Sequence, residues 1–310
     1  MTEVVAQARN LTKKYRDNVA LDDISFTLEA NRIYGLLGRN GAGKTTVMSI
    51  LTAQNFPTDG VVEVFGQPPF ENSRVLSRLC FIRESQKYPE DFTPKHAFKA
   101  AAMFFENWDQ GLCETLIQDF ELPMTRTIKK LSRGQLSAVG VIIGLASRAE
   151  LTFFDEPYLG LDAVARQIFY DRLLQDYAEH PRTIVLSSHL IDEVANLLEH
   201  VIVLDHGRII MNDDTESIRG SAYTAVGPGV AVREFVGSKP VLYSESIGSF
   251  AQMTVSEPLS EEGAQRAALL GVEIVPVSLQ QLIVRKTLGN RAAEFSGKDS
   301  ADASKKGAAA

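Results

Sequence analysis

The sequence predicts an α/β protein with a mostly parallel sheet at its centre. Mostly apolar segments at residues 32–37, 151–154 and 183–188 have the length and composition of buried strands. Segments with helical character, such as residues 163–177 and 191–199, follow two of these strands. Strands that alternate with helices form parallel sheets covered on both faces, because each crossover helix packs against the sheet between one strand and the next.

The composition is that of an ordinary globular chain with one large core and a smaller accessory part. The chain has 310 residues, of which 45% are hydrophobic, and its net charge of −7 argues against broad binding of nucleic acid. Its two cysteines, Cys80 and Cys113, lack the spacing of a metal site and indicate a reducing, cytoplasmic setting. The longest apolar run, residues 136–147, is too short to cross a bilayer, so we expect any connection to a membrane to come through a partner chain.

The first of these strands leads into a loop that predicts a phosphate-binding site. Residues 38–45 match the pattern G-x-x-x-x-G-K-[ST] without a mismatch, between a strand and a helix. Glycines let successive backbone N–H groups turn toward an anion, and a helix N-terminus favours phosphate. Lys44 adds a positive charge for the β- and γ-phosphates, and Thr45 adds a hydroxyl for Mg²⁺. The sequence therefore predicts a sheet of the P-loop NTPase type, with a loop made of Gly38, Arg39, Asn40, Gly41, Ala42, Gly43, Lys44 and Thr45.

Two later strands end in polar residues that nucleotide chemistry needs. The strand at 151–154 runs into Asp155 and Glu156, and the strand at 183–188 is followed by His189. Functional groups of a parallel sheet gather at the carboxyl ends of its strands, where the phosphate loop also emerges. We therefore expect Asp155 to hold Mg²⁺ through water and Glu156 to polarise an attacking water. His189 either contacts a γ-phosphate or is a packed or capping residue.

Other segments surround this core. Residues 4–28 have the alternating pattern of an N-terminal antiparallel β part, and residues 94–147 form a helical subdomain. Ser132 is placed to cap the last helix of that subdomain. Tyr15 stands in a polar loop, where an aromatic side chain either stacks on a purine base or packs in the loop.

The composition changes toward the C-terminus. We expect the first domain to span residues 1–219 and a small accessory α+β domain to span residues 220–290, with a strand at 230–232 and a helix over 261–270. Residues 291–310 are rich in alanine, serine, glycine and lysine and almost free of large apolar side chains, so we expect a disordered tail.

In their order and spacing, these motifs resemble those of the ATP-binding subunit of ATP-binding cassette (ABC) transporters, over roughly residues 4–214. The resemblance implies that Tyr15 stacks on adenine, that His189 is the switch histidine, and that Asp155 and Glu156 are the metal-binding and catalytic carboxylates. It extends the phosphate loop to Thr46. It also implies a signature motif made of Leu131, Ser132, Arg133, Gly134 and Gln135, and a loop that crosses a dimer interface, made of Gly160, Leu161 and Asp162.

The resemblance carries expectations about function as well as residues. It implies that the chain binds ATP and Mg²⁺ and hydrolyses ATP to power transport. The implied partners are a transmembrane permease subunit and a second ATP-binding cassette, identical or not, whose signature motif faces the phosphate loop of this chain. The implied location is cytoplasmic, on the inner face of the cell membrane. The separate cassette and its C-terminal extension resemble bacterial export systems in particular.

The sequence departs from the family pattern at two positions. Arg133 stands in the signature motif where the family usually has glycine. In the loop after residue 82, Glu84 and Gln86 compete for the position of a glutamine that senses metal and water. An ungapped count back from residues 92–93 favours Glu84, whose carboxylate can serve Mg²⁺ directly or through water. A two-residue gap would assign the position to Gln86 and leave Glu84 in solvent.

Two other functions compete with transport. One is a soluble cassette ATPase that acts on ribosomes or DNA, but the chain has neither two cassettes nor a long coiled coil, and its acidic balance disfavours nucleic acid. The other is a sensor subunit that binds ATP without hydrolysing it, against which the presence of Glu156 and His189 argues.

Overall fold

The computed structural model describes residues 3–84 and 86–284, and these form two compact units. One unit ends at Asn212 and the other begins at Asp213, which is earlier in the chain than the boundary expected after residue 219. Each unit is described by itself below. The tail expected at residues 291–310 lies outside the described residues.

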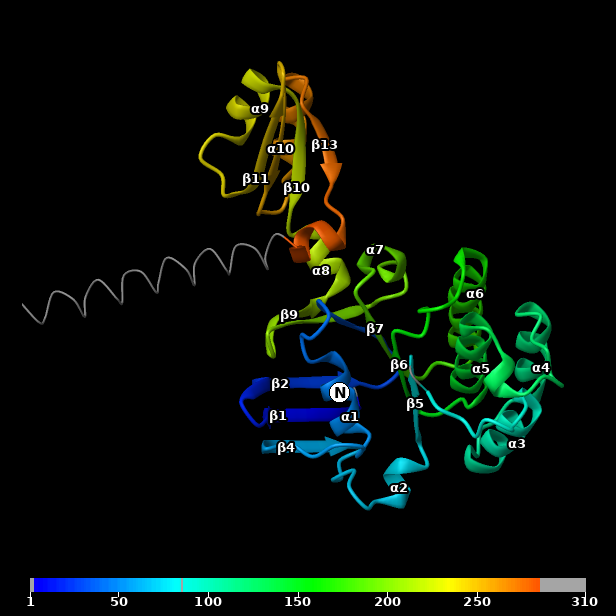
Figure 1. Ribbon diagram of the computed structural model, residues 1–310. Coiled ribbons are helices and arrows are strands. Elements are labelled where there is room, and N and C mark those ends of the chain that lie inside the picture. The colour runs from blue at the N-terminus through cyan, green and yellow to red at the C-terminus, as the bar shows by residue number, and fades with distance from the viewer. Residues whose placement is uncertain (1–2, 85, 285–310) are drawn as a thin grey trace, which may run out of the picture. The chain divides into compact units, whose positions relative to one another are not determined.

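The core of the first unit is a six-stranded sheet, which confirms the predicted fold class (Figure 1). Its strand order is β5-β6-β7-β3-β8-β9, and the neighbours β5 and β6, β6 and β7, β7 and β3, and β3 and β8 are parallel. The three central strands are buried along their whole length, as their apolar sequences require. The strands are β3 (Ile33–Leu37), β5 (Leu79–Arg83), β6 (Leu151–Asp155), β7 (Thr183–Ser188), β8 (His200–Asp205) and β9 (Arg208–Asp214).

An antiparallel sheet of three strands precedes and flanks this core, as expected for the N-terminal part. Its order is β2-β1-β4, with β1 at Val4–Tyr15, β2 at Asn18–Glu29 and β4 at Asp59–Val64. The inward side chains of this sheet share one apolar cluster with helix α1 (Lys44–Leu51) and with the parallel strands. Burial of this cluster fixes α1, and with it the phosphate loop, between the two sheets.

The remaining helices of the first unit include the expected helical subdomain. Helix α5 (Arg133–Ala146) packs against β5, β6 and α6, and α3 and α4 pack against α5 in turn (Figure 1). Every residue of α5 from Ala138 onward is buried, because the helix lies between the sheet and these other helices. The helices are α2 (Ser73–Leu76), α3 (Pro94–Phe104), α4 (Gln110–Asp119), a 3₁₀ turn η1 (Ile128–Lys130), α5, α6 (Ala163–Glu179) and α7 (Ile191–Val194).

The second unit is a small α+β domain built as β-α-β-β-α-β, the order of a ferredoxin-like fold. Its four strands are antiparallel in the order β11-β12-β10-β13. Helices α9 and α10 share an apolar cluster with strands β10 and β12. Its elements are α8 (Thr215–Gly220), β10 (Tyr223–Pro228), α9 (Gly229–Val236), β11 (Val241–Ile247), β12 (Phe250–Val255), α10 (Glu261–Leu269) and β13 (Glu273–Pro276).

The prediction of one strand in this unit is wrong. Residues 230–232 lie in the first turn of α9 and do not form a strand. The run of valine and alanine suits a strand locally, but the buried positions Val232, Phe235 and Val236 are spaced three and four apart, as on one face of a helix. Among the residues that the structure describes, no helix is both long and apolar enough to cross a membrane.

Candidate nucleotide-binding site

The loop between β3 and α1 is shaped by glycines that no other residue could replace without strain. Gly38, Gly41 and Gly43 have φ angles of 145°, 82° and 111°, in the region that favours glycine. A Cβ atom on Gly38 would lie 2.3 Å from the carbonyl oxygen of Leu204, and one on Gly43 would lie 2.8 Å from the carbonyl oxygen of Ala20. The backbone therefore curls around the N-terminus of α1, the arrangement that aims N–H groups at an anion.

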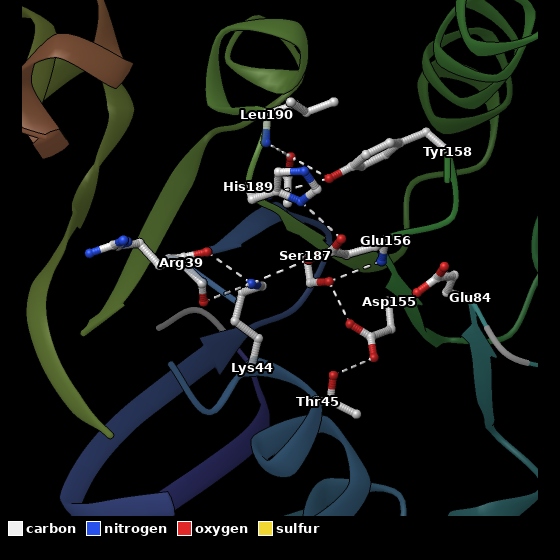
Figure 2. Close-up of polar contacts among 12 residues, drawn as sticks. Arg39, Lys44, Thr45, Glu84, Asp155, Glu156, Tyr158, Ser187, His189 and Leu190 are labelled. Carbon is white, nitrogen blue, oxygen red and sulfur yellow. Dashed lines mark hydrogen bonds and ion pairs between the residues drawn. The ribbon is translucent and has the colours of Figure 1, made fainter. Parts of the chain in front are cut away.

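Lys44 lies at the centre of this loop and is buried, with 5% of its side chain exposed. Its Nζ atom donates to the carbonyl oxygens of Gly38 at 2.8 Å and Arg39 at 3.3 Å, and it lies 3.3 Å from Oε1 of Glu156 (Figure 2). The ammonium group is thus held at the mouth of the loop by groups that all attract a cation. Phosphate oxygens are acceptors of the same kind and carry more charge.

Asp155 ends β6 and joins two neighbouring elements. Its Oδ2 atom accepts from the hydroxyl of Thr45 at 2.6 Å, and its Oδ1 atom accepts from the hydroxyl of Ser187 at 2.6 Å (Figure 2). The register of the sheet places Ser187 directly beside Asp155 on β7. The carboxylate therefore sits between the first turn of α1 and the carboxyl end of β7, with its orientation fixed by two hydroxyl groups.

Glu156 follows Asp155 with a φ of 49°, an uncommon conformation for a residue other than glycine. Its backbone N–H donates to the hydroxyl of Ser187 at 3.0 Å, and its carboxylate lies 3.3 Å from Lys44 Nζ and 2.9 Å from Nδ1 of His189. The side chain is 12% exposed. The turn at Glu156 directs this carboxylate back over the phosphate loop, and not away from the sheet edge (Figure 2).

His189 follows β7 and is held by Tyr158. The backbone N–H of His189 donates to the phenol oxygen of Tyr158 at 3.2 Å, and that oxygen is also 2.9 Å from the hydroxyl of Ser188. Burial raises the pKa of Tyr158 to about 12, so the phenol stays protonated. His189 is partly buried and is therefore a positioned side chain beside Glu156 rather than one free in solvent.

These groups line one cavity of about 670 Å³, within the range of about 300–1,000 Å³ usual for ligand sites. Most of the residues that the sequence predicts to bind nucleotide or metal, or to act in catalysis, lie around this cavity. They are Tyr15, Asn40, Gly41, Gly43, Lys44, Thr45, Thr46, Glu84, Asp155, Glu156 and His189. Three lining residues were not predicted: Asn18, Ala20 and Leu159. Asn18 and Ala20 lie at the start of β2, close in sequence to Tyr15, and this proximity is a signal that could have found them.

Tyr15 lies at the rim of the cavity with 43% of its surface exposed. The Nζ atom of Lys13 lies 4.8 Å from the centre of its ring, and the side chain of Asn55 donates to its hydroxyl. These two contacts hold the aromatic ring in place, so that it can serve as a stacking surface.

The competition between Glu84 and Gln86 is between two residues in different surroundings. Glu84 lines the cavity, and its backbone N–H donates to the carbonyl oxygen of Asp155 at 3.1 Å. Gln86 does not line the cavity, and its backbone N–H donates to the carbonyl oxygen of Arg83 at 3.1 Å. The carboxylate of Glu84 forms an ion pair with Arg133.

The signature residues lie apart from this cavity. Ser132 and Gln135 form a capping box at the start of α5, and Gly134 faces the loop after β6, where an added Cβ would lie 2.7 Å from the carbonyl oxygen of Gly160. Asp162 caps α6 by accepting from the N–H of Ala165 at 2.9 Å. Ser132, Arg133, Gly134, Gln135 and Asp162 do not line the cavity of their own chain, and neither do Gly38, Arg39 and Ala42 of the loop.

The donor set fits a nucleoside triphosphate and Mg²⁺. The loop supplies backbone N–H groups and Lys44 for phosphates, and Thr45 and Asp155 supply oxygen ligands of the kind that Mg²⁺ takes together with phosphate oxygens and water. Among residues 3–84 and 86–284, no group of three or more His, Cys, Asp or Glu side chains is arranged to hold a metal by itself. The protein side of a magnesium site would therefore be Thr45 and Asp155, with Glu84 nearby.

The fold and the loop define a P-loop nucleotide-binding protein. The family described as "ABC transporter" matches residues 21–159. The chain is 30% identical over 203 residues to AlbC, an ABC transporter ATP-binding protein of Bacillus subtilis, a match that covers 63% of this chain and 84% of AlbC. It is 28% identical over 257 residues to the Nod factor export ATP-binding protein I of Sinorhizobium fredii, covering 81% and 73% of the two chains.

A solved structure of the ATP-binding subunit of an ABC transporter matches with a TM-score of 0.63 and 22% identity, covering 69% of this chain and 92% of that one. The chain therefore belongs to the ABC transporter family, as one of its ATP-binding subunits. The predicted resemblance, the cassette fold and the function as an ATPase subunit that powers transport are confirmed at this level.

Proposed function

We propose that this chain hydrolyses ATP with Mg²⁺ as a dimer of cassettes on the inner face of the cell membrane, and that a separate transmembrane subunit uses the work for export. The observation that carries the proposal is the convergence of Lys44, Thr45, Asp155, Glu156 and His189 on one cavity. These are the residue types that phosphoryl transfer to water requires at the carboxyl edge of a parallel sheet. Export is supported by similarity to relatives such as the Nod factor export ATP-binding protein I.

In this mechanism the side chains of the site keep their positions in the fold, and Lys44 changes its partner. Lys44 leaves the carboxylate of Glu156 for the β- and γ-phosphates, since these carry more negative charge. Glu156 then retains His189 as its neighbour and orients the attacking water. Thr45 and Asp155 would hold Mg²⁺, and the charge that this ion would supply is opposite to that of the phosphates. Tyr15 provides the stacking surface for the base.

The signature residues support the dimer. Arg133, Gly134 and Gln135 lie at the start of α5 and not in the cavity of their own chain, so their role in nucleotide binding needs a second cassette. Hydrolysis is then expected to rise more than linearly with protein concentration until the dimer is saturated. A rate per cassette that is independent of concentration, with a monomer by light scattering, would contradict this arrangement.

The membrane partner is tested by affinity purification of the tagged chain from detergent-solubilised membranes of its host. We expect one polytopic membrane protein to co-purify with it in a fixed ratio, and reconstitution of that complex to give ATP-dependent efflux. Co-purification with ribosomes or DNA and with no membrane protein would instead support the rival function as a soluble cassette ATPase.

The role of Glu84 is tested by two variants of the loop after β5. Because Glu84 lines the cavity and Gln86 does not, we expect Glu84→Ala to raise the Mg²⁺ concentration needed for half-maximal ATPase rate, and Gln86→Ala to leave it unchanged. A shift in Gln86→Ala alone would transfer the metal-sensing role to Gln86.

A further inference from the structure

The two residues that depart from the family pattern contact each other. The guanidinium group of Arg133, in the signature motif, forms an ion pair with Oε1 of Glu84, in the loop after β5. Their side chains are 69% and 40% exposed. An exposed pair of this kind adds little to folding stability, because water screens it and both side chains lose freedom. Its importance must therefore lie in what Glu84 does.

Glu84 belongs to a set of three carboxylates at the cavity, and each has its own partners. Asp155 accepts from Thr45 and Ser187, and Glu156 contacts Lys44 and His189, all of which line the cavity or lie at the end of β7. The cationic partner of Glu84 is different. Arg133 does not line the cavity, but it forms an ion pair with Glu84, which does.

The backbone of Arg133 belongs to a helix, whereas Glu84 lies on a loop. Arg133 is the first residue of α5, directly after the cap Ser132, and its side chain lies against Gly160, where an added Cβ would come within 2.9 Å of its Cγ atom. Glu84 directly follows β5 and is 49 positions earlier in the chain. The ion pair with Arg133 therefore gives the carboxylate of Glu84 a partner that does not line the cavity.

We propose that Arg133 is a positioning residue that competes with Mg²⁺ for Glu84. The pair holds the carboxylate of Glu84 at the N-terminus of α5, and binding of the nucleotide with its metal draws Glu84 from Arg133 toward the metal. Arg133 thereby raises the Mg²⁺ concentration at which nucleotide binds. This inference rests on the proposed assignment of Glu84 to the metal site.

The competition predicts opposite effects for the two partners. Removing Arg133 leaves Glu84 available to the metal, so less Mg²⁺ is needed. Removing the charge of Glu84 takes away a metal ligand, so more Mg²⁺ is needed. The shift for Arg133 is expected to be about two- to fivefold, the range that exposed ion pairs allow.

The experiment measures binding, not turnover. The fluorescence of a labelled ATP analogue is titrated with Mg²⁺ at fixed nucleotide concentration for the full chain and for Arg133→Ala, Arg133→Lys, Glu84→Gln and the double variant Arg133→Ala/Glu84→Gln. We expect a lower Mg²⁺ midpoint in Arg133→Ala, a midpoint near that of the unmodified chain in Arg133→Lys, and a higher one in Glu84→Gln. In the double variant, the effect of Arg133→Ala should vanish.

The chain offers a matched control. Arg208 pairs with Asp22, and the exposures of the two side chains, 69% and 40%, equal those of Arg133 and Glu84. Arg208→Ala removes an equally exposed cation outside the cavity and is expected to leave the Mg²⁺ midpoint unchanged.

Three results would overturn the inference. An unchanged midpoint in Arg133→Ala, with a shift in Glu84→Gln, would refute the competition but leave Glu84 at the metal. An equal shift for Arg133→Ala with and without the charge of Glu84 would mean that Arg133 acts on the cavity independently. An unchanged midpoint in Glu84→Gln would remove Glu84 from the metal site and overturn both the assignment and the competition.

Discussion

Replacing Glu156 by glutamine separates the binding of nucleotide from its hydrolysis. The side chain is 12% exposed and its carboxylate contacts Lys44 at 3.3 Å and His189 at 2.9 Å. Glutamine has nearly the same shape and fills the same space, so the turn after β6 and the hydrogen bond from the backbone to Ser187 are retained. What is lost is the negative charge to which the proposed mechanism assigns the orientation of an attacking water.

The expected magnitude follows from the proposed role of the Glu156 carboxylate as a general base. Loss of such a group typically reduces the rate by about 10²- to 10⁴-fold, or about 2.7–5.4 kcal/mol of transition-state stabilisation. Affinity for ATP should not fall, because Lys44 no longer has to leave a carboxylate in order to contact phosphate. We therefore expect Glu156→Gln to bind ATP at least as tightly as the unmodified chain and to accumulate as an ATP-bound dimer.

Single-turnover hydrolysis with purified protein, together with equilibrium titration of a fluorescent ATP analogue, measures the two quantities separately. Glu193→Gln is a suitable control, since Glu193 is a more exposed carboxylate outside the cavity that pairs with Arg166. A rate for Glu156→Gln within a factor of a few of the unmodified chain would remove Glu156 from the catalytic role. Equal losses of rate and affinity would mean that the carboxylate mainly holds Lys44.

Three further outcomes are expected. Lys44→Ala should weaken binding of the ATP analogue itself, because it deletes the cation that contacts the loop carbonyls and Glu156. An unchanged affinity for the analogue would show that phosphate binds elsewhere. Asp176→Ala should lower the free energy of unfolding, measured in urea, by about 3 kcal/mol. The reason is that Arg182, which is 5% exposed and lies 2.6 Å from Asp176, then stays buried without this partner. A loss below about 1 kcal/mol would contradict this expectation. Burial raises the pKa of the Cys80 thiol from 9.0 to about 12, so its contribution to stability is complete below pH 9 and is lost as the pH rises toward 12. Native protein should accordingly resist alkylation of Cys80 at pH 8, and rapid labelling would refute its burial.

The parts of the fold that sequence predicts well are those in which local pattern and tertiary environment agree. The strands β3, β6 and β7 are buried along their whole length and mostly apolar because both of their faces are covered, and this makes them recognisable without knowledge of their neighbours. The phosphate loop is equally local: its glycines adopt positive φ angles within one short turn. A motif whose geometry is contained in eight consecutive residues can be identified from those residues alone.

Prediction fails where the environment decides between two acceptable local conformations. Residues 230–232 suit a strand by composition, and they are helical because the sheet of the second unit accepts an apolar helix face there. Glu84 and Gln86 are both polar residues after a strand, two positions apart. Only the pairing of β5 with β6, which carries Glu84 beside Asp155, distinguishes the residue that lines the cavity from the one that does not.

Ser187 was not predicted as a site residue, yet it contacts both the carboxylate of Asp155 and the backbone of Glu156 at the end of β6. Its hydroxyl donates to Oδ1 of Asp155 at 2.6 Å and accepts from the N–H of Glu156 at 3.0 Å. Sequence assigns it only to a buried strand, since a serine before a strand end is unremarkable by itself and the order β6-β7 is a property of the assembled sheet. The strained φ of 49° at Glu156 is stabilised by this hydrogen bond from its N–H. One hydroxyl on the neighbouring strand therefore both orients the candidate metal ligand and holds the turn that directs Glu156 over the phosphate loop.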